Sequence, residues 1–287
     1  MTSLKTNLQR TALPSLVFLV AFSFWPVLAR AANSFPERTA QGTLTPLQLE
    51  IQKQTERLSS ADSEERRDAV SLLGAMQRPE ASRASLPALR DSSAIVRATA
   101  ATAILSLPPG ESAGYLIPVL ADKDEFVRRE VAFALGKTHS QSALAPLIDR
   151  LNADKKDSVR GAAAVALGEL KDAAAALSLA QVLAPQTSRS NRKSRKEKDL
   201  FLLRAAAHSL GQIGSSAGLP ALVAALQDEK MADDVRREAA GALGLIGDAA
   251  AIPALRGVET ASDPYLAEAA HQAIRKIERR SRSSSGN

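Results

Sequence analysis

The chain has 287 residues, of which 45% are hydrophobic and only 3% aromatic, and its formal net charge is +6 at pH 7. This hydrophobic content is enough for a packed core, so disorder throughout the chain is excluded. The core must be built from Ala, Leu, Ile and Val, which suit close contact between helices, and an all-α fold is favoured. The sequence has no cysteine, which excludes disulfide bonds, a thiolate nucleophile and a zinc–thiolate site.

The first 31 residues have the layout of a secretory signal peptide. Lys5 and Arg10 precede an uncharged apolar run, and Ala29 and Ala31 then form an A-x-A cleavage signal. We therefore expect cleavage after Ala31 and a periplasmic or secreted protein. An uncleaved membrane anchor is the alternative, because a run of about 17 apolar residues is the lower limit for a spanning helix. In both cases the body of the protein leaves the cytosol.

A Leu-Gly pair at the end of a short Ala-rich segment recurs along the chain, and this period determines the expected fold. The pairs are Leu73-Gly74, Leu135-Gly136, Leu167-Gly168, Leu210-Gly211 and Leu243-Gly244, with degenerate copies at Ile104-Leu105 and Ile274-Arg275. Five of the six steps between second positions are 31 to 33 residues long, and the step from Gly168 to Gly211 is 43.

Each unit reads as a pair of helices. In residues 124–136 the apolar residues Val127, Val131 and Leu135 lie on one helical face, which predicts an amphipathic first helix. Prolines mark the start of a second helix, where a missing N–H costs no hydrogen bond. They are Pro87, Pro118, Pro146, Pro220 and Pro253. Gly214 and Gly247 are expected to take the left-handed conformation that ends a helix.

The sixth copy, residues 235–247, reads VRREAAGALGLIG, and this pattern resembles the HEAT-like repeats of the phycobilisome-lyase type. The resemblance covers about residues 63–280. It implies a right-handed α-solenoid of about six helix pairs, and the periodicity agrees because a helix pair buries its apolar faces only by stacking on neighbours. We expect a linker over 32–44, the solenoid over 45–280 with capping helices at 45–60 and 264–280, and a disordered tail over 281–287.

An arginine recurs near the start of the first helix, at Arg66, Arg97, Arg128, Arg160 and Arg236. An anion-binding array is one interpretation. Structural salt bridges and helix-end hydrogen bonds between stacked repeats are the favoured one, because acids such as Asp124, Asp157 and Asp234 lie just upstream and Leu203 replaces the arginine in the fifth copy.

No pattern in the chain predicts catalysis, a cofactor or a metal. Some HEAT-like families are metal enzymes, notably deoxyhypusine hydroxylase, which binds iron through repeated His-Glu steps. Here His139, His208 and His271 are followed by Ser, Ser and Gln, so that motif does not carry over. The bilin-lyase activity that gives the repeat type its name does not follow from a fold resemblance either. We therefore predict no catalytic, cofactor-binding or metal-binding residues.

The long step contains a basic insert over residues 185–198. The stretch from Ser188 to Asp199, SRSNRKSRKEKD, has a net charge of +4. Residues 275–287 carry another +4. Signal-peptide removal lowers the charge of the chain from +6 to +3, so the body of the solenoid is left with −5. The candidate partner-binding residues of the insert are Arg189, Arg192, Lys193, Arg195, Lys196 and Lys198.

Three interpretations of the insert remain open: a solvated loop, a contact to an anionic surface such as lipid headgroups or an acidic protein, and nucleic-acid binding. The absence of interleaved aromatic residues argues against nucleic acid. The leading hypothesis for the whole chain is an exported, non-catalytic scaffold that binds a protein partner. The partner is expected to bind on the second helices. The alternatives are a lyase-like or hydroxylase-like enzyme or accessory, and an electrostatic binder that acts through the insert and tail.

Overall fold

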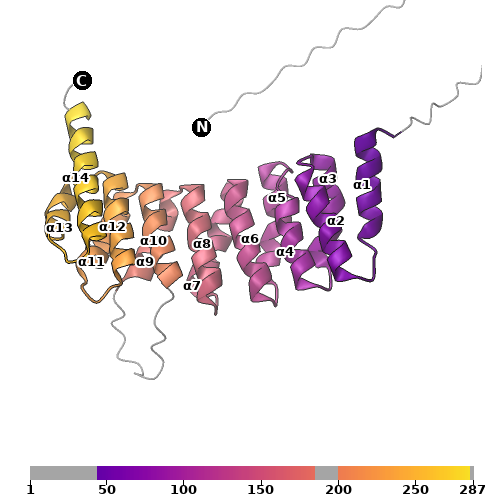
Figure 1. The fold of residues 1–287 in the computed structure, drawn as a ribbon, viewed down its shortest axis with the longest axis horizontal. Coiled ribbons are helices and arrows are strands. Elements are labelled where there is room, and N and C mark those ends of the chain that lie inside the picture. The colour runs from indigo at the N-terminus through magenta and orange to yellow at the C-terminus, as the bar shows by residue number, and fades with distance from the viewer. Residues whose placement is uncertain (1–43, 185–199, 285–287) are drawn as a thin grey trace, which may run out of the picture. The chain divides into compact units, whose positions relative to one another are not determined.

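The computed structural model describes residues 44–184 and 200–284, and every regular element in these ranges is a helix. Six helix pairs, repeats 1 to 6, follow one another between two single helices (Figure 1). The first helices are α2 (Ser63–Ala75), α4 (Ala94–Ala103), α6 (Glu125–Thr138), α8 (Asp157–Leu170), α10 (Leu200–Ile213) and α12 (Asp233–Ile246). The second helices are α3 (Pro79–Ser85), α5 (Pro109–Leu116), α7 (Leu144–Ala153), α9 (Ala176–Leu183), α11 (Leu219–Gln227) and α13 (Ile252–Arg256).

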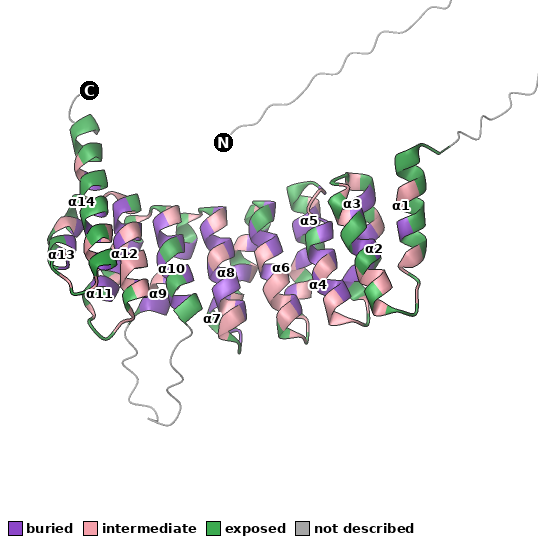
Figure 2. Cartoon of the chain, viewed as in Figure 1, coloured by how far each residue is buried: buried purple, intermediate pink, exposed green. Residues whose placement is uncertain are grey.

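The helices α1 (Pro46–Arg57) and α14 (Pro264–Ser284) close the two ends of the stack, and both present long exposed faces (Figure 2). The expected all-α solenoid of six helix pairs with two capping helices is confirmed. One boundary differs: α14 continues to Ser284, beyond the expected end at residue 280. Hydroxyls of Ser281 and Ser283 donate to carbonyls one turn back, and basic side chains near a helix C-terminus are favourable. No helix among the described residues has the length and apolar content needed to cross a membrane.

The helices form two layers. Successive first helices contact one another from α2 to α14, and the second helices α7, α9, α11 and α13 contact one another in the same order. The leucine of each Leu-Gly pair lies between the layers and is fully buried. These residues are Leu73, Leu135, Leu167, Leu210 and Leu243. The core is therefore built from Leu, Val and Ala, as the composition predicts.

Repeats 1 and 2 differ from the expected hairpin. Their second helices begin at Pro79 and Pro109, and Pro87 and Pro118 instead open short 3₁₀ segments that follow. A proline inside a helix lacks the N–H for the α-helical bond and its ring clashes with the preceding turn, so the α-helix stops there. Repeats 3 to 6 have a three-residue 3₁₀ turn before the second helix.

The turn after each first helix is left-handed at the same place in five repeats. Gly214 and Gly247 have φ of +71° and +79°, which confirms the expected glycine conformation. Gln77, His139 and Lys171 occupy the equivalent position in repeats 1, 3 and 4 with φ between 50° and 54°.

Successive first helices touch at the glycine of the Leu-Gly pair. A Cβ on Gly74 would lie 2.9 Å from the Cα of Ala103, and one on Gly244 would lie 2.8 Å from the Cα of Ala273. Similar contacts join Gly136 to Ala166, Gly168 to Ser209 and Gly211 to Ala242. Contacts this short leave no room for a methyl group, so the glycine sets the spacing at these five junctions. Leu105 stands at this position in repeat 2, so the junction of α4 with α6 has no such glycine.

The arginine row forms a structural ladder in repeats 1 to 3. Each arginine makes a bidentate ion pair with an aspartate that follows the second helix of its own repeat, at shortest nitrogen–oxygen distances of 2.7, 2.7 and 2.8 Å. The pairs of this arginine–aspartate ladder are Arg66–Asp91, Arg97–Asp122 and Arg128–Asp154. The main-chain oxygen of Asp91 also accepts a hydrogen bond from Arg97, so the ladder joins one repeat to the next.

Each of repeats 4 to 6 lacks one partner of the ladder. Ala184 and Gly257 follow the second helix in repeats 4 and 6, and Leu203 replaces the arginine of repeat 5. Arg160 and Arg236 donate instead to a carbonyl in the last turn of the preceding second helix and to an aspartate of their own helix. These acceptors are Leu151 and Asp157 for Arg160, and Leu226 and Asp233 for Arg236.

All five arginines are therefore bonded within the chain, and the structural interpretation of the row is confirmed. Of the three upstream acids expected to pair with these arginines, only one is a partner. Asp157 does pair with Arg160, whereas Asp124 accepts from the main-chain N–H of Phe126 and Asp234 lies 3.6 Å from Arg204.

We expect Gly244→Ala to lower the free energy of unfolding by about 1–3 kcal/mol, because the new methyl group must push α14 away from α12. Gly241→Ala is the matched control in the same helix, where a Cβ meets no atom within 4 Å. The control should be neutral or stabilising by up to about 1 kcal/mol, because it removes a glycine from a helix interior. Denaturant unfolding of the two variants measures the difference. Equal effects would show that the glycine contact does not set the spacing.

The ladder predicts a loss of stability in acid. Burial raises the pKa of Asp122, but the hydrogen bonds from Arg97 and from a main-chain N–H outweigh burial and hold the pKa below its ordinary value. A carboxylate with a depressed folded-state pKa stabilises the fold above its unfolded pKa, and this contribution is lost as the pH falls below about 4. We expect Asp122→Asn to cost about 1.5–3 kcal/mol at pH 7 and much less at pH 3.

The control for this prediction is Asp228→Asn. Asp228 has the same place in repeat 5 and accepts from the N–H of Lys230, but Leu203 stands where the arginine would be. Its substitution should change the unfolding free energy little at either pH. If Asp228→Asn lowered the unfolding free energy as much as Asp122→Asn does, the loss of stability would come from the turn and not from the ion pair.

Candidate protein-binding surface

The outward side of the second helices, here called the second-helix surface, has an uncharged centre. The helices α9 and α11 contain no charged residue, and their exposed positions are occupied by Leu177, Gln181, Pro220, Ala224 and Gln227. Their opposite sides are buried in the core through Leu179, Leu183, Leu222 and Leu226. Removing water from an uncharged surface costs little free energy. The centres of protein interfaces are likewise depleted in charged residues.

Leu177 is the unusual residue of this surface. The residue nine positions after the glycine of the Leu-Gly pair, or after Leu105 in repeat 2, is exposed in every repeat. This row consists of Arg83, Gly114, Ala145, Leu177, Pro220 and Pro253. Leu177 is the one large apolar member, and 65% of its surface is exposed. It therefore contributes little to the packing of the fold, and its side chain is available to a partner.

Repeat 4 departs from the other repeats in two further ways. Ala184 stands where three repeats have the ladder aspartate, and the basic insert follows directly in the sequence. The described chain stops at Ala184 and resumes at Leu200, the first residue of α10, on the edge of the stack that carries the ladder. Leu177 and the insert thus belong to the same helix pair.

The outward side of the first helices is different, because many of its charges are paired within the chain. Arg129 lies 5.0 Å from the ring centre of Phe126 and contacts Glu130, and Arg237 lies 5.7 Å from the ring centre of Tyr265. Arg204 faces Asp234 at 3.6 Å. A partner would have to disrupt these pairs to bind there.

The histidines also make contacts on the surface. His208 lies 2.6 Å from a carboxylate oxygen of Glu238, and His271 lies 2.9 Å from one of Glu259. Among the residues that the structure describes, no group of three His, Asp or Glu side chains is arranged to hold a metal ion.

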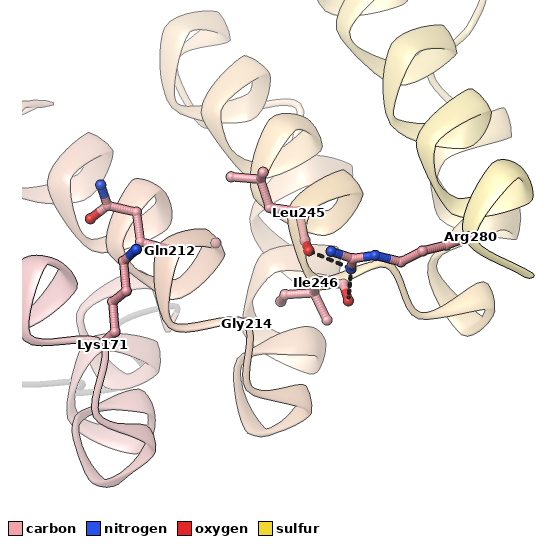
Figure 3. A pocket seen from close by; sticks show the side chains of 7 residues that line it. Lys171, Gln212, Gly214, Leu245, Ile246 and Arg280 are labelled. Atoms are coloured by element: carbon pink, nitrogen blue, oxygen red, sulfur yellow. Dashed lines mark hydrogen bonds between the residues drawn. The ribbon is translucent and has the colours of Figure 1, made fainter. Parts of the chain in front are cut away.

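A hollow of about 450 Å³ lies at the edge of the stack where the first helices end (Figure 3). It is lined by Lys171, Gly211, Gln212, Gly214, Leu245, Ile246 and Arg280. Nη1 of Arg280 donates to the carbonyl oxygens of Leu245 and Ile246 at 2.9 and 3.0 Å. The guanidinium thus caps the C-terminus of α12, which explains its position there without a ligand.

The six basic candidates of the insert lie outside the described residues: Arg189, Arg192, Lys193, Arg195, Lys196 and Lys198. The expected cleavage residues Ala29 and Ala31 lie outside them as well, with the linker that follows. These predictions therefore stay predictions.

The sequence profile of the family described as HEAT repeats matches residues 113–197 and 195–275. Together these segments cover more than half of the chain. The chain belongs to the HEAT repeat family. The predicted membership among HEAT-like repeat proteins is thereby confirmed. The comparison with curated proteins gave no match.

Several solved structures are similar to this chain. YibA from Escherichia coli is 22% identical, with 81% of this chain and 82% of YibA covered and a TM-score of 0.57. A chain of the CpcE–CpcF complex of phycocyanin lyase from Nostoc sp. is 22% identical, with 87% of this chain and 99% of that chain covered and a TM-score of 0.48. Human deoxyhypusine hydroxylase is 20% identical, with coverage of 80% and 84% and a TM-score of 0.40. At these identities the likeness concerns the fold alone.

Sequence reasoning placed the candidate contact on the insert and missed Leu177. The signal was present in the repeat alignment, because one row of second-helix residues reads Arg, Gly, Ala, Leu, Pro, Pro from repeat 1 to repeat 6. Only the structure shows that this row is exposed throughout. An unpacked leucine therefore could not be told from a core leucine by periodicity alone.

Proposed function

We propose that the protein is an exported HEAT-repeat scaffold that binds a partner protein on the second-helix surface around α9 and α11 and performs no chemistry itself. The observation that carries the proposal is Leu177, a leucine 65% exposed at the centre of an uncharged surface. Burying a leucine side chain in an interface contributes roughly 1.5–3 kcal/mol. The fold does not use this contribution, so a partner can.

The rest of the molecule supports a binding role. Repeat stacks present long surfaces whose outward residues vary without disturbing the packing. The contacts of Gly168 and Gly211 fix the spacing of the helix pairs that contain α9 and α11, so a partner meets a preformed surface and little ordering entropy is lost on binding. Export is supported by the basic, apolar and A-x-A segments of the first 31 residues.

The direct test is a photo-crosslinking amino acid at position 177 in the full chain, activated in intact cells. We expect one protein to be crosslinked at position 177 and not at position 265. Tyr265 is the matched control, because it is 71% exposed but lies on α14, away from the second helices. Crosslinks of equal yield at both positions, or none at position 177, would contradict the proposal.

Two readouts complete the same experiment. A Leu177→Asp variant should keep the unfolding free energy within about 0.5 kcal/mol, as surface substitutions do, and lose the partner in co-purification. The intact mass of the recovered protein reports export, since cleavage after Ala31 removes the first 31 residues. A full-length mass in a soluble fraction would contradict export as a cleaved protein.

A further inference from the structure

Two charged residues flank the uncharged centre of the second-helix surface, and they have opposite signs. Asp149 is exposed on α7, and Arg256 is exposed on α13. The helices α7, α9, α11 and α13 contact one another in this order, so the surface changes from acidic to apolar to basic along the stack.

Among the described residues, no hydrogen bond or ion pair joins the side chain of Asp149 or Arg256 to another residue. Two other arginines of the second helices are paired: Arg83 lies 3.1 Å from Glu111, and Arg150 lies 3.7 Å from Asp154. A charge that stabilises no element of the fold remains available for an external group.

In the repeat alignment, Asp149 and Arg256 each occupy a position at which the other five repeats have an uncharged residue. Thirteen positions after the glycine, Asp149 is the one charged residue among Pro87, Pro118, Asp149, Gln181, Ala224 and Gly257. Twelve positions after it, Arg256 is the one charged residue among Leu86, Ile117, Ile148, Ala180, Val223 and Arg256. The stacking of repeats therefore does not require either of them, and neither does the fold.

We propose that the partner of this surface is a protein segment that is apolar in its middle, with a basic group at the end over Asp149 and an acidic group at the end over Arg256. This proposal rests on the proposed function and names the chemistry of its partner. Neighbouring helices pack about 8–10 Å apart, so the three steps from α7 to α13 span roughly 25–30 Å. A helix of about 17–20 residues has that length.

The opposite signs distinguish this partner from a polyanion. Nucleic acid and an anionic lipid surface carry one sign of charge and would be repelled by Asp149. A segment with one basic and one acidic end satisfies both charges, and such rim pairs determine the choice of partner more than the strength of binding.

The test uses three synthetic helical peptides of about 20 residues, a length set by the helical rise. All have the same leucine-centred middle; one carries Lys at one end and Glu at the other, one carries Lys at both ends, and one carries Glu at both. Fluorescence anisotropy measures the dissociation constant of each peptide for the wild-type protein at low and high salt. We expect the mixed peptide to bind roughly threefold to tenfold tighter than the others at low salt, with a smaller difference at high salt.

Charge reversal should change the preference in a defined direction. Asp149→Lys places two cations at the rim and should make the Glu–Glu peptide the tightest. Arg256→Glu places two anions there and should make the Lys–Lys peptide the tightest. Glu80→Lys and Arg90→Glu are controls that make the same changes in net charge at exposed sites in repeat 1, outside the α7–α13 path, and they should leave the mixed peptide as the tightest binder.

The outcomes separate this inference from the proposed function. Crosslinking at position 177 in cells together with no peptide preference, or with a preference that the reversals do not alter, overturns the inference and leaves the scaffold proposal standing. Peptide binding that survives Leu177→Asp also overturns it, because the segment then binds elsewhere. A preference that follows both reversals and disappears in Leu177→Asp establishes it.

Discussion

At five of the six contacts between successive first helices, from α2 to α14, a glycine in one helix packs against an alanine or serine in the next, and the repeat stack depends on this constraint. With no side chain at the glycine, the two helix backbones approach until a Cβ would lie under 3 Å from a neighbouring atom. This distance fixes the period of the stack and selects small residues along the first helices. It also accounts for a core of Leu, Val and Ala with almost no aromatic residues, since a large ring would force the helices apart.

Because stacking uses the inward faces, differences between repeats are free to accumulate on the outward faces. The arginine–aspartate ladder is complete in repeats 1 to 3, and each later repeat lacks one partner. The departures concentrate in repeat 4, which has lost the ladder aspartate, carries the insert and exposes Leu177. Asp149 and Arg256 flank this repeat and the next. The proposed binding surface consists of residues that depart from the repeat pattern, and the repeat stack supports them rigidly.

Much of the fold could be predicted from the sequence. The Leu-Gly period predicted six helix pairs, and Gly214 and Gly247 predicted the left-handed turns. The second helices of repeats 1 and 2 could not be placed, because Pro87 and Pro118 open 3₁₀ segments after a helix that begins earlier. The ladder partners were also hidden, since Asp91 and Asp122 lie 25 residues after their arginines and only the hairpin brings them together. The surface around Leu177 could not be predicted from the sequence, because periodicity does not show which row of second-helix residues is exposed.

If the proposal is right, Leu177 of repeat 4 contacts the partner. Methyl NMR of the selectively labelled protein tests this contact most directly, with the partner recovered by crosslinking added in increasing amounts. We expect the Leu177 methyl resonances to shift and those of Leu245, which is exposed on the first-helix side of repeat 6, to stay unchanged. Unchanged Leu177 resonances together with shifts on the first-helix side would contradict it.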